Sequence, residues 1–229
     1  MILHSLTMAL PEFFCWTRFG TEAGQPIEQI FARKEQERIA NQGVFFWGIG
    51  NAIGPSLLEL LRRSQTPEAV FSPIQSAPRM EDASPSSVVA WTKAETLSGE
   101  EYRLPEHSLI TSRFDPLKPK SRHYALVCYS TTRITIGPSS EQIHFGALRN
   151  LLTSRPVGAS QVTAVVHMAA SGGNRKNATY DIAFRAQLAP PYFVLLGGPV
   201  PLGHSQASGC WAEIVRQTWD FKRQARAAG

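Results

Sequence analysis

The sequence predicts an α+β protein with a mixed or barrel-like β-sheet and helices packed at its edges. Short β-prone segments outnumber helical ones along the 229 residues. Sixteen prolines and seventeen glycines favour many turns over long helices. Strands and helices also lack the regular alternation of a doubly wound parallel sheet. With 43% hydrophobic and 18% charged residues, the composition is that of an ordinary globular protein.

The N-terminal segment predicts one strand and one amphipathic helix. Residues 12–19, EFFCWTRF, are aromatic and β-prone. Pro26 suits the first position of a helix, and Gly43 suits its end. The apolar positions between them share one helical face: Ile27, Ile30, Phe31 and Ile39. The other face, RKEQER, is charged, and we expect it to be solvated.

The next elements are short strands and one leucine-rich helix. Residues 44–49 predict a buried strand, and Pro55 starts a helix that carries Leu57, Leu58, Leu60 and Leu61. Further strands are predicted at residues 69–75, 86–95 and 107–113. In residues 122–130, RHYALVCYS, both faces are apolar, which predicts a central strand.

The C-terminal half predicts a helix, three strands and a last helix. The leucine spacing of residues 143–154 favours a short helix. Strands are predicted at residues 160–170, 180–188 and 191–198, and an amphipathic helix follows from Gly209. We expect a domain at residues 12–130 and an α+β extension at residues 131–229, packed on the same core. The loop 114–121 is the best candidate for a weak boundary.

Charge and cysteine usage indicate the partners and the compartment. Lys and Arg exceed Asp and Glu by 23 − 18 = +5, which favours anionic partners, with nucleic acid (DNA or RNA) first. Cys15, Cys128 and Cys210 form neither a CxxC pair nor a disulfide framework, as expected in a reducing cytoplasm. No segment has the apolar length of a membrane span, and the N-terminus lacks the features of a signal peptide. We therefore expect a cytoplasmic protein with no membrane partner.

The stretch GVFFWGIGNAIGPS, residues 43–56, contains a possible phosphate cradle. Gly48, Gly50 and Gly54 are spaced G-x-G-x-x-x-G, one residue longer than the dinucleotide-binding fingerprint. No acidic residue closes a following strand, and the three-layer βαβ pattern is missing. A plain strand-to-helix turn is the commoner interpretation, and we predict no cofactor.

The same stretch also places an aromatic ring beside an amide. A flat ligand stacked on Trp47 and held at its edge by Asn51 would use the physics of base recognition in extruded or single-stranded nucleic acid. Each such stack contributes about 1–3 kcal/mol. The alternative is that Trp47 fills the core together with Phe45.

An early aromatic strand, then a helix, then FFWGIGN is an order of elements that resembles the PUA-like superfamily, notably its EVE and YTH branches. The likeness rests on Trp47, Gly48 and Asn51 and covers about residues 12–130. It implies a small barrel whose pocket accepts a modified base in nucleic acid. The EVE pattern usually has an arginine just before that asparagine, whereas this chain has Gly50, so the ligand specificity does not transfer directly.

Cationic and amide side chains gather at the ends of apolar segments in the middle of the chain. Those that suit phosphates or a base edge are Arg113, Arg149, Arg155 and Gln161, with Ser112 beside Asn51 at the base edge. The segment GASQ, residues 158–161, predicts a turn whose backbone N–H groups can hold an anion. Taken singly, each side chain is more often a surface residue or a helix cap, and their concentration carries the hypothesis.

We therefore predict a nucleic-acid-binding module that recognises a flipped-out or single-stranded base, modified or not, in an aromatic pocket. The alternative is a small enzyme acting on a nucleotide or another phosphorylated metabolite, and a third possibility is a protein-interaction domain. The conceivable nucleophiles and bases are Cys15, Cys128, Ser112, His107, His123, His144 and His167. No nucleophile elbow, protease box or metal-ligand spacing is present, so no catalytic residue or metal ligand is assigned, and Cys128 is expected to be a buried, inert thiol.

Overall fold

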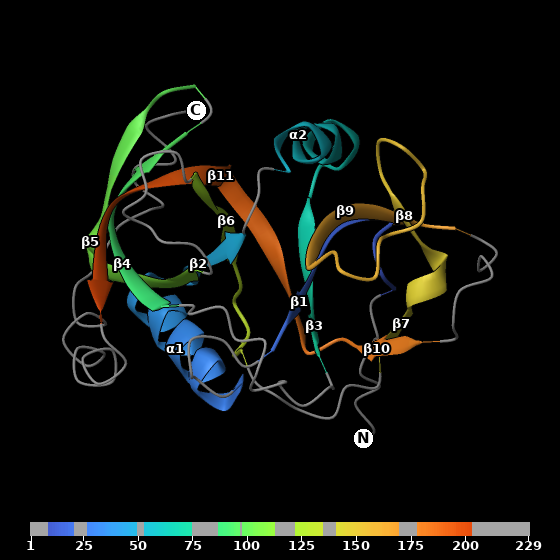
Figure 1. Cartoon of the computed structure of the whole chain (residues 1–229), viewed down its shortest axis with the longest axis horizontal. Coiled ribbons are helices and arrows are strands. Elements are labelled where there is room, and N and C mark those ends of the chain that lie inside the picture. The colour runs from blue at the N-terminus through green and yellow to red at the C-terminus, as the bar shows by residue number, and fades with distance from the viewer. Residues whose placement is uncertain are drawn as a thin grey trace, which may run out of the picture.

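The chain forms an α+β structure in which two helices accompany a large mixed β-sheet (Figure 1). The structure is a computed structural model, and it describes residues 9–20, 27–49, 53–74, 87–96, 98–112, 122–134, 141–169 and 178–202. The helical elements are α1 (Ile27–Ala40), α2 (Gly54–Arg63) and a 3₁₀ turn, η1 (Phe145–Ala147). The strands are β1 (Phe13–Phe19), β2 (Val44–Ile49), β3 (Glu68–Pro73), β4 (Ser87–Glu95), β5 (Glu101–Ser112), β6 (His123–Tyr129), β7 (Gln142–His144), β8 (Leu148–Asn150), β9 (Thr163–Met168), β10 (Thr179–Asp181) and β11 (Phe184–Leu202).

Nine of these strands make one sheet, and β7 pairs with β10 separately. The main path runs β2-β6-β11-β3-β1-β9-β8, while β4 and β5 continue from the far end of β11. Only β1 and β3 pair in parallel; every other ladder among the described strands is antiparallel. No ladder between described strands joins β5 to β2, so this sheet is not closed into a barrel.

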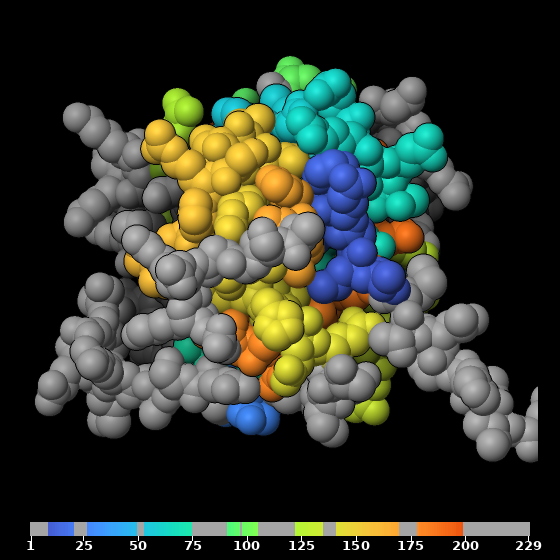
Figure 2. Space-filling model, turned by 90° about the vertical axis from the view of Figure 1, so that its right-hand side faces the viewer, coloured from blue at the N-terminus to red at the C-terminus, as the bar shows by residue number. Residues whose placement is uncertain are grey.

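Both faces of the central strands are buried, as their alternating apolar residues predict. One face carries the central core, in which α1 contributes Ile30 and Phe31 and α2 contributes Leu57 and Leu60. The helices therefore cover a face of the sheet rather than its edges. In Figure 2, the view from the β8 side, α2 (cyan) and β1 (blue) lie beside the yellow residues of the segment 141–169. The opposite face is divided between one cluster under β2, β6, β11, β4 and β5 and another under β1, β3 and β9.

The charged face of α1 is more buried than we expected. Lys34 is 3% exposed, and its Nζ lies 2.6 Å from Oε2 of Glu37. Oε1 of Glu37 in turn accepts the backbone N–H of Phe46 in β2 at 3.0 Å. Burial lowers the pKa of Lys34, and the neighbouring Glu37 opposes that shift. Ile30 and Phe31 are buried as expected, whereas Ile39 is 63% exposed, because it lies nine residues, or two and a half turns, after Ile30 and so on the opposite side of the helix.

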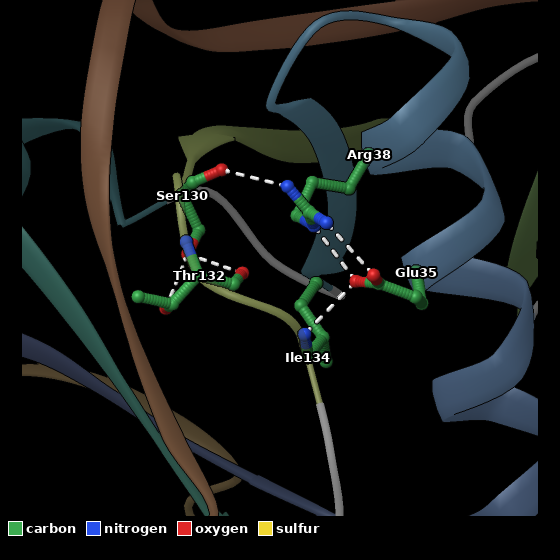
Figure 3. Close-up of polar contacts among 5 residues, drawn as sticks. All are labelled: Glu35, Arg38, Ser130, Thr132 and Ile134. Carbon is green, nitrogen blue, oxygen red and sulfur yellow. Dashed lines mark hydrogen bonds and ion pairs between the residues drawn. The ribbon is translucent and has the colours of Figure 1, made fainter.

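A second carboxylate on α1 holds the segment that follows β6 (Figure 3). Glu35 accepts two hydrogen bonds of 2.7 Å from the guanidinium of Arg38 and one of 2.9 Å from the backbone N–H of Ile134. Arg38 also donates to the carbonyl of Ser130 at 3.3 Å. The expectation of a solvated face was therefore wrong here, because these charges bind groups that lie far away in the sequence.

The strand predicted at residues 122–130 is confirmed as central, since β6 lies between β2 and β11. The helix predicted at residues 143–154 is wrong: this segment forms β7, η1 and β8. Its apolar residues pack under the sheet as Ile143, Ala147 and Leu148, a spacing that a helix would share. The strand predicted at residues 180–188 spans the end of β10 and the start of β11, and the one predicted at 191–198 lies within β11, whose register shifts between Leu188 and Phe193.

The helix predicted from Gly209 lies outside the residues that the structure describes. Within the described ranges, none of the helices has the length and apolar character needed to cross a bilayer.

Candidate nucleic-acid interface

Trp47, the residue predicted to stack on a base, lies in the central core. Its side chain is 8% exposed. Its ring makes edge contacts with Phe19, Phe71 and Phe184, at centroid separations of 5.6, 4.7 and 6.1 Å. Such edge-to-face packing is typical of buried aromatic clusters. As placed, the indole has no open ring face for a base, and its position is that of a core residue.

The other residues of the predicted aromatic pocket are described only in part. Gly48 is half-buried in β2, opposite Ala125 of β6. Ser112 is the last residue of β5 and pairs with Ser87 of β4. Asn51 and Arg113 lie outside the described residues.

Three predicted residues, Arg149, Arg155 and Gln161, come together in the hairpin that joins β8 to β9. Asn150 links two of them: its Nδ2 donates to the carbonyl of Arg155 at 3.2 Å, and its Oδ1 accepts from Nε2 of Gln161 at 3.3 Å. Arg149 forms an isolated antiparallel bridge with Pro156, so the loop folds back on β8. The three residues therefore lie on one short, ordered unit at the edge of the sheet.

The two arginines of this hairpin differ in their freedom. Nη1 of Arg149 donates to the carbonyls of Gly146 and Leu148 at 2.6 and 3.0 Å, so this side chain supports its own turn. Arg155 is exposed, and its guanidinium has no partner among the described residues. Arg155 is therefore the one whose charge is open to an external anion.

The predicted turn at residues 158–161 is confirmed. The backbone N–H of Gln161 donates to the carbonyl of Gly158 at 3.0 Å. The side-chain Oε1 of Gln161 accepts the N–H of Gly158 at 3.3 Å, which closes the turn from the other side.

Arg18 on β1 is the residue that our sequence argument missed. Its Nη2 donates to the carbonyls of Ala159 and Gln161, both at 2.7 Å, and its Nη1 donates to the hydroxyl of Tyr180 at 3.1 Å. The side chain is only 9% exposed. The sequence could have pointed to Arg18, because residues two apart in a strand share a face, and this places Arg18 on the same face of β1 as the aromatic Trp16.

Three aromatic rings surround the Arg18 guanidinium. Its Cζ lies 5.4 Å from the ring centroid of Trp16, 6.0 Å from Phe145 and 5.6 Å from Tyr180. Rings at these distances attract a cation through their quadrupoles. Arg18 makes no ion pair with any residue that the structure describes, and its partners among those residues are the three rings, two carbonyls and a hydroxyl.

The two described cysteines are poorly placed to act as nucleophiles. Cys15 and Cys128 are both fully buried, which confirms the expectation for Cys128. Burial raises the pKa of Cys15 to about 12 and that of Cys128 well above its usual value, so both remain thiols rather than reactive thiolates. Burial also lowers the pKa of His123, which packs against Trp91. Within the described parts of the chain, no cluster of three or more His, Cys, Asp or Glu residues has metal-binding geometry.

No family model, no curated protein and no solved structure matches this chain. Its function is therefore inferred from its own residues.

Proposed function

We propose that the chain binds single-stranded nucleic acid through the β8–β9 hairpin. The observation that supports this proposal is that Arg149, Arg155 and Gln161 lie on one hairpin at the edge of the sheet. The exposed guanidinium of Arg155 has no partner among the described residues, and Arg18 binds the carbonyl of Gln161. Guanidinium forks suit phosphate oxygens, and an amide can pair with a base edge. The charge of the surrounding sequence agrees, because residues 142–180 contain four Lys or Arg and no Asp or Glu.

We assign the stacking of a base to Tyr180 and Phe145 rather than to Trp47. Both rings pack against Trp16 and the Arg18 guanidinium, and their centroids are 5.8 Å apart, but unlike Trp47 they are only half-buried. One guanidinium, that of Arg18, binds both the Tyr180 hydroxyl and the carbonyls of the 158–161 turn, so this phenol lies next to the hairpin. A base against these rings would leave its phosphate within reach of the hairpin, and the stack would contribute about 1–3 kcal/mol.

The PUA-like resemblance is a separate proposal. It is supported by the order of elements in residues 12–130 and by the Trp47–Asn51 segment. The proposal that the β8–β9 hairpin binds nucleic acid does not depend on this resemblance. No observation among the described residues favours the alternative of an enzyme acting on a nucleotide.

Fluorescence anisotropy of labelled single-stranded DNA and RNA, about 12 nucleotides long, tests the binding proposal over a range of salt concentrations. We expect the logarithm of affinity to fall linearly with the logarithm of salt concentration, because phosphate contacts release counterions. Replacing Arg155 with alanine should reduce that slope by about 0.7, the value for one contact to a single strand. Absent or salt-insensitive binding by the unmodified chain would refute the proposal.

Two variants make the test specific. Arg103→Ala removes the same charge from an exposed position on β5, which lies at the opposite end of the molecule from β8 in Figure 1, and should leave the slope unchanged. Phe145→Leu keeps apolar bulk but removes a ring, and should weaken binding without changing the slope. Equal losses in the Arg155 and Arg103 variants would show that net charge, and not the hairpin, attracts the oligonucleotide.

A further inference from the structure

The geometry points to a phosphate-binding site at the turn Gly158–Gln161, where outward backbone N–H groups hold a phosphate oxygen and Arg18 fixes the turn from behind. This inference rests on the proposed function and adds to it the atoms that would contact the nucleic-acid backbone. The ligand chemistry is a phosphate group, and we assign it to the phosphodiester of a single strand.

Arg18 sets the direction of the peptide groups in this turn. Its Nη2 binds the carbonyls of Ala159 and Gln161 at 2.7 Å each. In a planar trans peptide the N–H points opposite to the carbonyl, so the N–H of Ser160 is directed away from Arg18. The carbonyl of Gly158 accepts the N–H of Gln161 across the turn, which by the same rule directs the N–H of Ala159 outward.

The outward side of the turn is open and rich in donors. Ala159 and Ser160 are both exposed. Neither N–H has a hydrogen-bond partner among the residues that the structure describes. Ser160 also carries a hydroxyl, which can act as a further donor. Successive free N–H groups in a turn form a concavity that binds anions.

The charge of Arg18 favours an anion on that outward side. A buried charge is ordinarily paired, yet the acceptors of Arg18 within the described chain are neutral. The Arg18 guanidinium binds the carbonyl of Ala159 and polarises that peptide group, so the N–H at its other end, that of Ser160, becomes more positive. Residues 142–180, which lie between Glu141 and Asp181, contain no acidic side chain, so the turn has no carboxylate near it in the sequence.

Amide NMR spectra of the ¹⁵N-labelled full chain test the site. One arm titrates inorganic phosphate, and a second titrates a single-stranded oligonucleotide that lacks a terminal phosphate. We expect the Ala159 and Ser160 amides to show the largest shifts in both arms. Shifts of these amides with inorganic phosphate alone would overturn the assignment to a phosphodiester, and shifts confined to other residues in both arms would overturn the site.

Gln161→Glu provides the matched variant. The carboxylate can still accept the N–H of Gly158, but it cannot donate to Oδ1 of Asn150 as the amide does, and it places a negative charge beside the bound phosphate. We expect oligonucleotide affinity to fall by about fivefold or more and the salt slope to fall by about 0.7. Gln36→Glu, the same change at an exposed position of α1, should leave both unchanged. Equal effects of the two variants would overturn the inference.

The outcomes separate this inference from the proposed function. If the oligonucleotide binds while the Ala159 and Ser160 amides do not shift, the turn is refuted as a contact and the proposed function stands. If inorganic phosphate shifts these amides while no oligonucleotide binds, nucleic-acid binding is refuted and the turn is a site for free phosphate. If the Gln161→Glu variant fails to fold, the Ala159 and Ser160 amide shifts of the unmodified chain decide whether the turn binds phosphate.

Discussion

Replacing Trp47 with alanine tests whether this indole belongs to the core or to a ligand slot. The side chain is 8% exposed and is surrounded by Phe19, Phe71 and Phe184. Truncating a buried aromatic residue to alanine costs about 3–5 kcal/mol. Surface area gives a similar figure: about 150–250 Å² of buried ring at about 25 cal/mol/Å² corresponds to about 4–6 kcal/mol, which is an upper bound. We therefore expect the free energy of unfolding to fall by about 3–5 kcal/mol.

Urea denaturation followed by far-UV circular dichroism measures this change without depending on tryptophan fluorescence. Leu58→Ala is the control, because Leu58 is 54% exposed on α2 and its loss should change the free energy of unfolding by no more than about 0.5 kcal/mol. Trp47→Phe, which keeps a ring in the core, should leave oligonucleotide affinity unchanged. A loss below about 1 kcal/mol for Trp47→Ala would refute the core placement and restore the indole as the wall of an open slot.

Three further predictions concern the core and the α1 network. Gly43→Ala should destabilise the chain by about 1–3 kcal/mol, since Gly43 has φ of 103° and an added Cβ would lie 2.6 Å from a tyrosine ring of β6. Thermal denaturation checks this, with Gly54→Ala as the control because a Cβ at Gly54 meets nothing within 4 Å. Equal melting temperatures of the two variants would contradict the prediction. Cys15 and Cys128 should resist iodoacetamide in the folded protein and react after unfolding, as peptide mass spectrometry would show; rapid native labelling of either would contradict their burial. The hydrogen bond from Arg38 holds the pKa of Glu35 below the ordinary value of 4.5. The ionised Glu35 carboxylate therefore stabilises the fold fully above pH 4.5, and this stabilisation is lost as the pH falls through the lowered pKa. The free energy of unfolding should then differ between the unmodified chain and Glu35→Gln at neutral pH, with the difference shrinking in acid; a difference constant from about pH 7 to about pH 3 would argue against this role.

Local patterns predicted most strands because alternation and turn residues are written in consecutive positions. The segment 122–130 alternates apolar residues on both faces, and it is the buried strand β6. Residues 143–154 misled the same reasoning, because a short apolar segment with helical spacing can also be two edge strands joined by a tight turn. Gly43 was expected to end α1, and its N–H closes the helix on the carbonyl of Arg38 at 2.7 Å.

The site was harder to predict because its contacts join distant parts of the chain. On α1, Glu35 likewise accepts the backbone N–H of Ile134, 99 positions later. Arg18 acquires its role from carbonyls 141 and 143 positions away, which no local pattern reveals. Trp47 was placed in the correct strand, but the sequence could not tell that aromatic rings from other elements would cover its face.

The position of β11 has a consequence for how the chain is made. β11 lies between β6 and β3, so it joins the β2–β6 pair to the β3–β1 pair. Until residues 184–202 leave the ribosome, these two ladders have no common strand, and their exposed backbone edges are open to improper association. We expect nascent chains that stop before β11 to depend on chaperones, and the complete sheet to assemble slowly because its pairings are long in sequence separation.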